Sequence, residues 1–242
     1  MNKIIAHIPH SSLYIPEKYR DMFLLDESSL RNELICMTDL YTDEIFDGFT
    51  NQVLLPYSRL VCDVERFRNK EEEEMSEKGM WVCYTLTSQQ TPLKHVDEAH
   101  EKEILQIYDA HHAKLEKMCE DLLNMHGEVL IVDCHSFHPQ PLPYEYNQDT
   151  NRPDICIGAD SYHTPENLVN KLVSAYEAFG YRVAINAPFS GSLTPLKYYQ
   201  KNPNVHSVMI EINRKLYMDK KGQKTAHFEQ LKKNIMKPFL TS

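Results

Sequence analysis

The sequence predicts a three-layer α/β/α fold built on a mostly parallel, mixed β-sheet. Short apolar runs bounded by turn residues, of which residues 129–132 are the clearest, are typical of strands buried on both faces. These runs alternate with longer segments in which apolar residues recur every three or four positions, as in helices. Ligands bind such sheets at the carboxyl ends of the strands, so polar residues that end the apolar runs are candidates for a site.

Length and charge limit the class of protein. The chain has 242 residues and a mass of 28.3 kDa, which predicts a single domain over residues 1–242. A net charge of −9 argues against nucleic acid as a partner, because phosphate binding depends on dense lysine and arginine. No apolar stretch approaches the roughly 20 residues that cross a bilayer, so no membrane partner is expected. The first residues lack a secretory signal, which favours a cytoplasmic protein.

Seven apolar runs predict strands. In chain order they cover residues 3–8, 52–55, 60–64, 128–132, 154–158, 181–186 and 207–212. Pro9 ends the first run, a proline-rich loop over residues 139–153 follows the fourth, and an irregular stretch over residues 187–192 follows the sixth. Residues 80–86 are predicted to form a strand or a flap, and the acidic residues 71–78 a surface loop or helical turn. Six dispersed cysteines without a Cys-x-x-Cys pair are predicted to be reduced core residues.

Four segments with apolar residues at three- and four-residue steps predict helices. They cover residues 28–49, 97–125 and 165–179, and a C-terminal segment from about residue 225. Gly127 and Gly180 are natural ends for the second and third helices. In the first helix Asp39, Asp43 and Asp47 share a face, which is either solvated or opposite a cation, because like charges at this spacing repel. The histidines of the second helix are expected at its surface or boundary: His100, His111, His112 and His126.

Polar residues at the ends of the apolar runs are the candidates for chemistry. They are His10, Asp63, Glu65, Asp133, His135 and Glu211. In a parallel sheet these ends gather at one edge, so residues far apart in sequence can converge. Two histidines and a carboxylate suit a zinc ion that keeps a coordination position open, and no thiolate cluster competes. Each residue alone is equally well explained by packing, but their recurrence at several strand ends favours a site.

Strand alternation separates the roles of these residues. Asp133 and His135 point to the same side of their strand, so Asp133 is either a ligand or a group that orients His135, and we favour the orienting role. Glu211 is embedded in an apolar strand, and desolvation there would raise its pKa, which suits a general base.

Arginines and small polar residues supply further candidates for substrate binding. Arg59, Arg66 and Arg214 flank the segments above. Each either binds a substrate carboxylate through its planar guanidinium or forms an internal ion pair with a nearby acid. Ser190 and Ser192 either line a small pocket or belong to a plain loop. His138 follows the central strand and is expected as a loop residue that meets substrate.

The ordered set of motifs resembles the N-formylglutamate amidohydrolase family. The matching segments are Pro9-His10-Ser11-Ser12, Thr38-Asp39-Leu40-Tyr41-Thr42-Asp43, Ser58-Arg59-Leu60-Val61-Cys62-Asp63-Val64-Glu65-Arg66, Asp133-Cys134-His135-Ser136, Ala187-Pro188-Phe189-Ser190-Gly191-Ser192 and Glu211-Ile212-Asn213-Arg214-Lys215-Leu216-Tyr217. They run through residues 9–217, nearly the whole chain, in the family's order. The resemblance implies a fold like that of zinc-dependent exopeptidases such as carboxypeptidases, and hydrolysis of an amide next to a carboxylate-bearing amino acid.

The resemblance also implies roles for individual residues. His10 and His135 resemble metal ligands, and Glu211 resembles the general base. The three arginines resemble anion-binding residues. Leu13 occupies the place where carboxypeptidases carry a glutamate ligand, so a third ligand must come from elsewhere. Our choice is Asp39, with two alternatives: Asp63 and Glu65.

One segment departs from the family pattern. Where the family is expected to have Asp-x-Asn-Arg, this chain has Asp63-Val64-Glu65-Arg66, which adds negative charge near the expected anion site. Three functions are therefore weighed. The first is zinc-dependent hydrolysis of an N-formyl or other N-acyl amino acid, N-formylglutamate-like, to the free amino acid and formate. The second is a carboxypeptidase-like deacylase or peptidase on another small carboxylate-bearing substrate. The third is a non-catalytic binding protein of the same fold.

Overall fold

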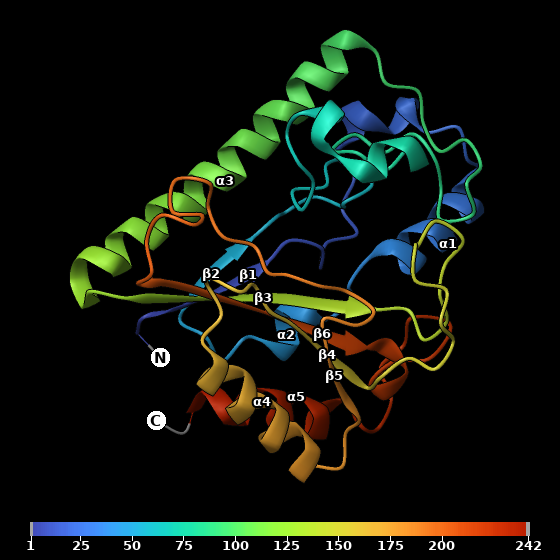
Figure 1. The fold of residues 1–242 in the computed structure, drawn as a ribbon. Helices are drawn as coiled ribbons and strands as arrows, with labels where there is room; N and C mark the ends of the chain where they lie inside the picture. Colours follow the sequence, from blue (N-terminus) through green and yellow to red (C-terminus); the bar gives the residue numbers. More distant parts are fainter. Residues whose placement is uncertain (1, 241–242) are drawn as a thin grey trace.

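A six-stranded β-sheet with the strand order β2-β1-β3-β6-β4-β5 runs through the middle of the molecule (Figure 1). The structure is a computed structural model and describes residues 2–240. The strands are β1 (Ile4–Ile8), β2 (Asn51–Leu54), β3 (Val129–Phe137), β4 (Ile155–Gly158), β5 (Val183–Ile185) and β6 (Val205–Asn213). Four of the five neighbouring pairs are parallel, whereas β4 and β6 run antiparallel. The predicted mostly parallel, mixed sheet is therefore confirmed.

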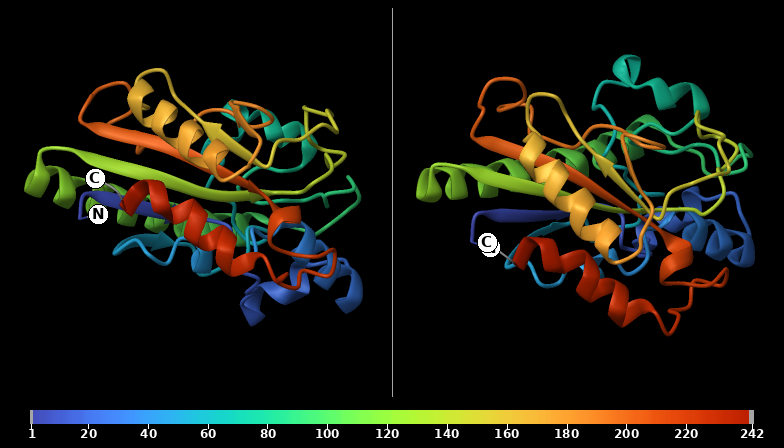
Figure 2. Two further views of the ribbon diagram at one scale, coloured as in Figure 1. Left: turned by 90° about the horizontal axis from the view of Figure 1, so that it is seen from below. Right: turned by 60° about the horizontal axis from the view of Figure 1, so that its bottom comes forward.

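Helices cover both faces of the sheet. The α-helices are α1 (Glu27–Met37), α2 (Thr42–Ile45), α3 (Glu98–His126), α4 (Glu166–Ala178) and α5 (Phe228–Leu240). Short 3-10 helices are η1 (Glu17–Met22), η2 (Lys70–Glu72), η3 (Glu74–Lys78) and η4 (Arg214–Leu216). The long α3 lies along one face, and α4 and α5 pack against the other (Figures 1 and 2). This arrangement gives the three layers that the sequence predicts.

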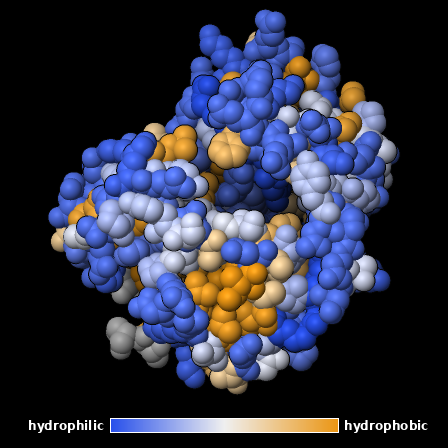
Figure 3. Space-filling view, in the orientation of Figure 1, coloured by the Kyte–Doolittle hydropathy of each residue, from blue (hydrophilic) through white to orange (hydrophobic). Residues whose placement is uncertain are grey.

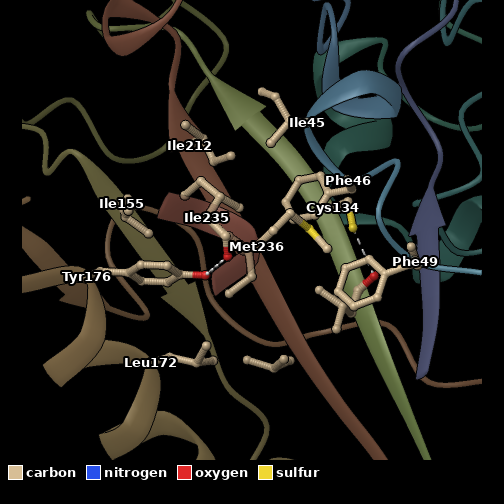
Figure 4. Close-up of a cluster of buried hydrophobic side chains, with 14 of the residues drawn as sticks. Ile45, Phe46, Phe49, Cys134, Ile155, Leu172, Tyr176, Ile212, Ile235 and Met236 are labelled. Carbon is tan, nitrogen blue, oxygen red and sulfur yellow. Dashed lines mark hydrogen bonds between the residues drawn. The ribbon is translucent and has the colours of Figure 1, made fainter. Parts of the chain in front are cut away.

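Apolar packing holds the layers together. Figure 4 shows part of the core between the sheet and the helices α4 and α5, where Leu172 and Tyr176 lie close to Ile235. The Tyr176 hydroxyl donates to the Ile235 carbonyl over 3.1 Å, so this buried polar group is satisfied. On the opposite face, Leu115 of α3 packs against Ile131 of β3. A further core fills the space beneath residues 55–96, beyond the edge of the sheet.

The single helix predicted over residues 28–49 is wrong. Helix α1 ends at Met37, because Thr38 adopts an extended conformation, and α2 begins only after Tyr41, which has a left-handed φ of 69°. The break is held by the backbone N–H of Asp39, which donates to the carbonyl of His10 over 2.9 Å. Asp39 therefore points toward the end of β1 instead of sharing a helix face with Asp43 and Asp47.

The strand predicted over residues 60–64 is also wrong. These residues form turns, in which the N–H groups of Val61 and Cys62 both donate to the Ser58 carbonyl. Their apolar side chains are buried in the core beneath residues 55–96, so the run is apolar without belonging to the sheet. The carbonyls of Leu60 and Val61 accept hydrogen bonds from the buried Lys94 ammonium, at 2.5 and 3.0 Å. An apolar run alone does not separate these two environments.

The other elements differ from prediction mainly in length. Strand β3 continues to Phe137, so Asp133 and His135 lie within it and not beyond its end, and Glu211 lies within β6 (Val205–Asn213), as predicted. All six cysteines are free, as predicted. Within residues 2–240, none of the helices has the length and apolar character needed to cross a membrane.

Candidate active site

The side of the sheet that faces α3 changes from apolar to polar toward the carboxyl ends of its strands. On β3, Ile131 packs against α3, and Asp133 and His135 follow it on the same side. The strand register places His7 of β1 beside Asp133 and Glu211 of β6 beside His135. Polar side chains from three neighbouring strands therefore meet at one edge of the sheet.

His10, Asp39 and His135 form one buried cluster at this edge. Asp39 Oδ2 lies 3.6 Å from His10 Nδ1 and 3.2 Å from His135 Nδ1. One donor atom from each residue lies within 4.8 Å of the other two, and no more than 5% of any of the three residues is exposed. These are the three residues predicted from the sequence to be metal ligands, and the structure brings them together.

Two further carboxylates hold the imidazole rings from behind. Asp63 Oδ1 lies 2.9 Å from His10 Nε2, and Asp133 Oδ1 lies 3.0 Å from His135 Nε2. A bound ion would take the lone pair of each Nδ1, and each Nε2 would then donate its hydrogen to the carboxylate behind it, because an ionised carboxylate only accepts. Asp63, considered as a third ligand, and Asp133, considered as a ligand or an orienting group, both occupy orienting positions.

The donor set fits a zinc ion. His10 Nδ1 is buried and has no hydrogen-bond partner among the described residues, which is costly unless a ligand satisfies it. Two imidazole nitrogens and one carboxylate oxygen are the ligands of catalytic zinc sites that keep a fourth position open. Carboxylates behind both histidines are the usual support of such ligands. His10, His135 and Asp39 are thus the residues that can hold the ion.

Asp39 is ionised and firmly placed. Burial alone would raise its pKa, but close contacts with His10 and His135 and the charge of Arg214 keep the pKa well below the ordinary value. Arg214 Nη2 donates to Asp39 Oδ1 over 2.8 Å, and its Nε donates to Ser136 Oγ over 3.1 Å. Arg214 therefore forms an internal ion pair, one of the two alternatives weighed for it.

Glu211 lies beside this cluster with a free carboxyl group. Its Oε2 is buried and has no hydrogen-bond partner within residues 2–240. Burial raises the pKa of Glu211 to about 8, and the negative charge of Asp39 adds to this, whereas His135 and Arg214 oppose it. A carboxyl group with such a pKa can accept and release a proton near neutral pH.

The remaining two arginines converge on Asp63. Arg59 donates to Asp63 Oδ2 through Nη2 at 2.7 Å and Nε at 3.3 Å, and Arg66 Nη2 lies 3.6 Å from the same oxygen. Arg66 also donates to the Met80 carbonyl and the Tyr84 hydroxyl. No acceptor for Arg59 Nη1 lies among residues 2–240, so Arg59 keeps a donor for a ligand.

A cavity of about 410 Å³ opens over the cluster, and the surface in Figure 3 is hollowed near its centre by a depression with hydrophilic walls. His10, Asp39, His135, Glu211, Arg59, Arg66, Arg214, Ser190 and His138 all line the cavity. Ser192 does not line it, because its hydroxyl pairs with Ser207 Oγ at 2.6 Å. Tyr144, from the proline-rich loop, lines it beside Arg59 and was not predicted.

A second polar group lies next to the first and was largely missed. His7 Nδ1 lies 2.8 Å from Asp133 Oδ1 and 3.1 Å from Glu65 Oε1, and His7 Nε2 lies 2.8 Å from His111 Nε2. His111 is 5% exposed, so its predicted place at the surface or boundary of α3 is wrong. Burial opposes protonation of His7, but the two carboxylates outweigh it and raise the pKa of His7 to about 9. His7 lies two residues after Ile5 on the side of β1 that faces α3, just as Asp133 lies two residues after Ile131 on β3. Strand alternation in the sequence was therefore the signal that could have identified His7.

Fold and site together define an α/β enzyme whose polar centre lies at the carboxyl edge of a mostly parallel sheet, under an open cavity. The family model for N-formylglutamate amidohydrolase matches residues 2–218, nine-tenths of the chain. The chain belongs to the N-formylglutamate amidohydrolase family, a family of hydrolases.

Solved structures show the same fold. The crystal structure of N-formylglutamate amidohydrolase from Ralstonia eutropha superposes with a TM-score of 0.85 and 19% sequence identity, over 98% of this chain and 91% of that chain. A gene product from Agrobacterium tumefaciens superposes with a TM-score of 0.68 and 20% identity, over 99% of this chain and 91% of that chain. A search of curated proteins gives no match.

Proposed function

We propose that this protein is a zinc-dependent amidohydrolase that cleaves the N-formyl or N-acyl amide of a carboxylate-bearing amino acid resembling N-formylglutamate. The observation that carries the proposal is the convergence of His10 Nδ1, His135 Nδ1 and Asp39 Oδ2 beside the unpartnered carboxyl of Glu211, within one cavity. Family membership supports the choice of an amide as the bond that is cleaved.

His10, His135 and Asp39 would hold the ion. When bound, zinc supplies Lewis acidity, which polarises the amide carbonyl and acidifies water. The chain's own contribution is to keep these three ligands fixed: Asp63 and Asp133 hold the two histidines, and Arg214 holds Asp39.

Glu211 moves the proton. Its Oε2 accepts a proton from water as the new C–O bond forms at the acyl carbon. The same carboxyl then gives the proton to the amide nitrogen as the C–N bond breaks, which releases the amino acid and the acid, formate in the case of a formyl group. A pKa of about 8 for Glu211 fits both steps, because the carboxyl group keeps the proton between the two steps and can still release it to the amide nitrogen.

Arg59 would bind the substrate carboxylate. Asp63 fixes two nitrogens of its planar guanidinium, Nε and Nη2, and the third, Nη1, has no acceptor within the part of the chain that the structure describes. Arg66 and Arg214 add positive charge to the same cavity, although their donors are used within the protein. This charge favours an anionic substrate.

The same site can serve a second substrate class, an N-acyl amino acid with a smaller negative charge than N-formylglutamate. Glu65 stands where the family pattern has asparagine, and it lines the cavity. A carboxylate in this wall repels a dianionic substrate more than a monoanionic one.

One experiment tests both forms of the proposal. The purified protein, stripped with a chelator and reloaded with zinc, is assayed on N-formylglutamate beside N-formyl and N-acetyl derivatives of neutral and acidic amino acids. Release of free amino acid that needs zinc and is fastest with N-formylglutamate supports the first form, whereas faster release from neutral derivatives supports the second. Absence of zinc-dependent release from every derivative contradicts both.

A further inference from the structure

We propose that His7, Glu65 and Asp133 form a second site for a divalent transition-metal ion, adjacent to the site of His10, Asp39 and His135. The three residues come from β1, from the turn after Asp63, and from β3. One donor atom from each lies within 4.8 Å of the other two. The proposal concerns metal binding alone and does not depend on the hydrolytic activity proposed above.

Two carboxylates, those of Asp133 and Glu65, converge on the single imidazole of His7. Asp133 is 1% exposed, and the carboxylate of Glu65 lies against the same imidazole. Buried carboxylates need a cation or several hydrogen bonds. The nearby Arg59 and Arg66 are directed at Asp63, so neither neutralises this pair.

Glu65 Oε1 is a buried oxygen that lacks a hydrogen-bond donor among the described residues, although His7 Nδ1 is 3.1 Å away. The one hydrogen that Nδ1 can carry is directed at Asp133, over 2.8 Å. Without a further ligand, Glu65 Oε1 is left with an unmade interaction, which costs free energy in a buried position.

His111 of α3 supports the ring of His7 on the side away from the carboxylates. Its Nε2 lies 2.8 Å from the Nε2 of His111, which belongs to α3. A neutral His111 can accept the Nε2 hydrogen of His7 over this distance, which fixes the ring and its tautomer. Nδ1 is then the ligand atom of His7, and an ion that binds there displaces the Nδ1 proton to solvent.

The donor set and the access route fit a small divalent ion. One imidazole and two carboxylates suit zinc or manganese, the latter because it accepts more oxygen ligands. Glu65 lines the same cavity as His10 and His135, so an ion can enter from the cavity. Asp133 contacts both His7 and His135 through Oδ1, and it therefore links the two sites.

The test is the metal content of the full-length protein. Chelator-stripped protein is dialysed separately against zinc and against manganese, and bound metal is counted per chain by elemental analysis. We expect two ions per chain with at least one of the metals. Glu65→Gln should retain one ion, His10→Gln should retain one, and the double variant should retain none.

Thermal unfolding supplies a second readout on the same samples. Metal should still raise the melting temperature of His10→Gln, because the second site remains, and should no longer do so in the double variant. One ion per chain in the unmodified protein that Glu65→Gln still binds overturns the proposal. One ion per chain that Glu65→Gln loses and His10→Gln keeps supports the second site and counts against the site of His10, Asp39 and His135. Two ions per chain in both the unmodified protein and Glu65→Gln would also overturn it, since the second ion would then lie elsewhere.

Discussion

The backbone N–H of Asp39 donates to the carbonyl of His10 over 2.9 Å. This single bond joins the break between α1 and α2 to the end of β1, and it brings a carboxylate from a helical segment to a histidine that follows a strand. The side chains of the same two residues then meet over 3.6 Å, between His10 Nδ1 and Asp39 Oδ2. Backbone geometry therefore places two of the three candidate metal ligands before any metal is considered.

Replacing Glu211 by glutamine should remove turnover and leave zinc bound. Glutamine keeps the size of the side chain but cannot carry the proton, so we expect kcat to fall roughly 10²- to 10⁴-fold, the usual contribution of a general base. Zinc content and melting temperature should stay close to those of the unmodified protein. Measured turnover within a factor of two of that protein would rule out Glu211 as the base.

Replacing Asp63 by asparagine should destabilise the fold. Asp63 is fully buried and accepts from His10 Nε2, Arg59, and the Tyr84 hydroxyl at 2.5 Å. Its loss leaves buried positive charge without a partner, which costs about 3–5 kcal/mol of unfolding free energy. Urea unfolding followed by circular dichroism measures this change.

Asp109→Asn is the matched control for that variant. Asp109 pairs with Arg68 at 2.7 Å, but both side chains are about half exposed, so the loss should stay below about 1 kcal/mol. Equal losses in the two variants would show that burial does not govern the strength of these pairs.

Replacing Arg59 by lysine should weaken substrate binding. A lysine ammonium would take the place of the guanidinium at Asp63 and leave no donor in the position of Nη1. We expect KM for the preferred carboxylate substrate to rise about tenfold, or about 1.4 kcal/mol, with kcat nearly unchanged. Arg68→Lys, at the surface, is the control. A fall in kcat at constant KM would instead assign Arg59 to the reaction step.

Lys94 should make the free energy of unfolding increase as the pH rises from 8 to 10.5. Burial lowers the pKa of Lys94 from 10.5 to about 8. Between pH 8 and 10.5 the unfolded chain keeps a proton that the folded chain has lost, so raising the pH favours the folded state through this residue. The gain reaches about 3 kcal/mol across the window.

Lys94→Met isolates this contribution, because the other titrating groups cancel when the two proteins are compared at each pH. Any stability advantage of the methionine variant should shrink by about 3 kcal/mol from pH 8 to pH 10.5, whatever its starting value. Parallel curves of unfolding free energy against pH would show that Lys94 keeps an ordinary pKa in the folded protein.

Apolar runs and strand alternation in the sequence were enough to predict much of the sheet and part of the site. The apolar run before Asp133 predicted β3, and alternation placed Asp133 and His135 on one side. Asp39 was chosen from a family resemblance while its local structure was predicted wrongly, as a helix. The hydrogen bond to the His10 carbonyl, which sets its position, joins residues 29 positions apart and has no local signature.

The missed residues depend on strand register and on burial by distant segments. His7 meets Asp133 because β1 and β3 pair in one particular register, which neither strand's sequence specifies. His111 is buried because α3 packs over this part of the sheet, although helix periodicity alone gave no sign of a polar partner. Residues 60–64 were assigned to the sheet because their burial beneath residues 55–96 produces the same apolar pattern as a strand.

The unequal lengths of β1 and β3 have an evolutionary consequence. Pairing of β3 with β1 stops at Asp133, whereas pairing with β6 continues to Phe137. The chain after Ile8 leaves the sheet, and His10 is carried by this segment, which the Asp39 backbone N–H anchors through the His10 carbonyl, while His135 stays in the strand. Insertions or deletions between Ile8 and His10 could move one ligand relative to the other without disturbing the hydrogen bonds of the sheet. The same scaffold can in this way be retuned for a new substrate by changes in a three-residue stretch.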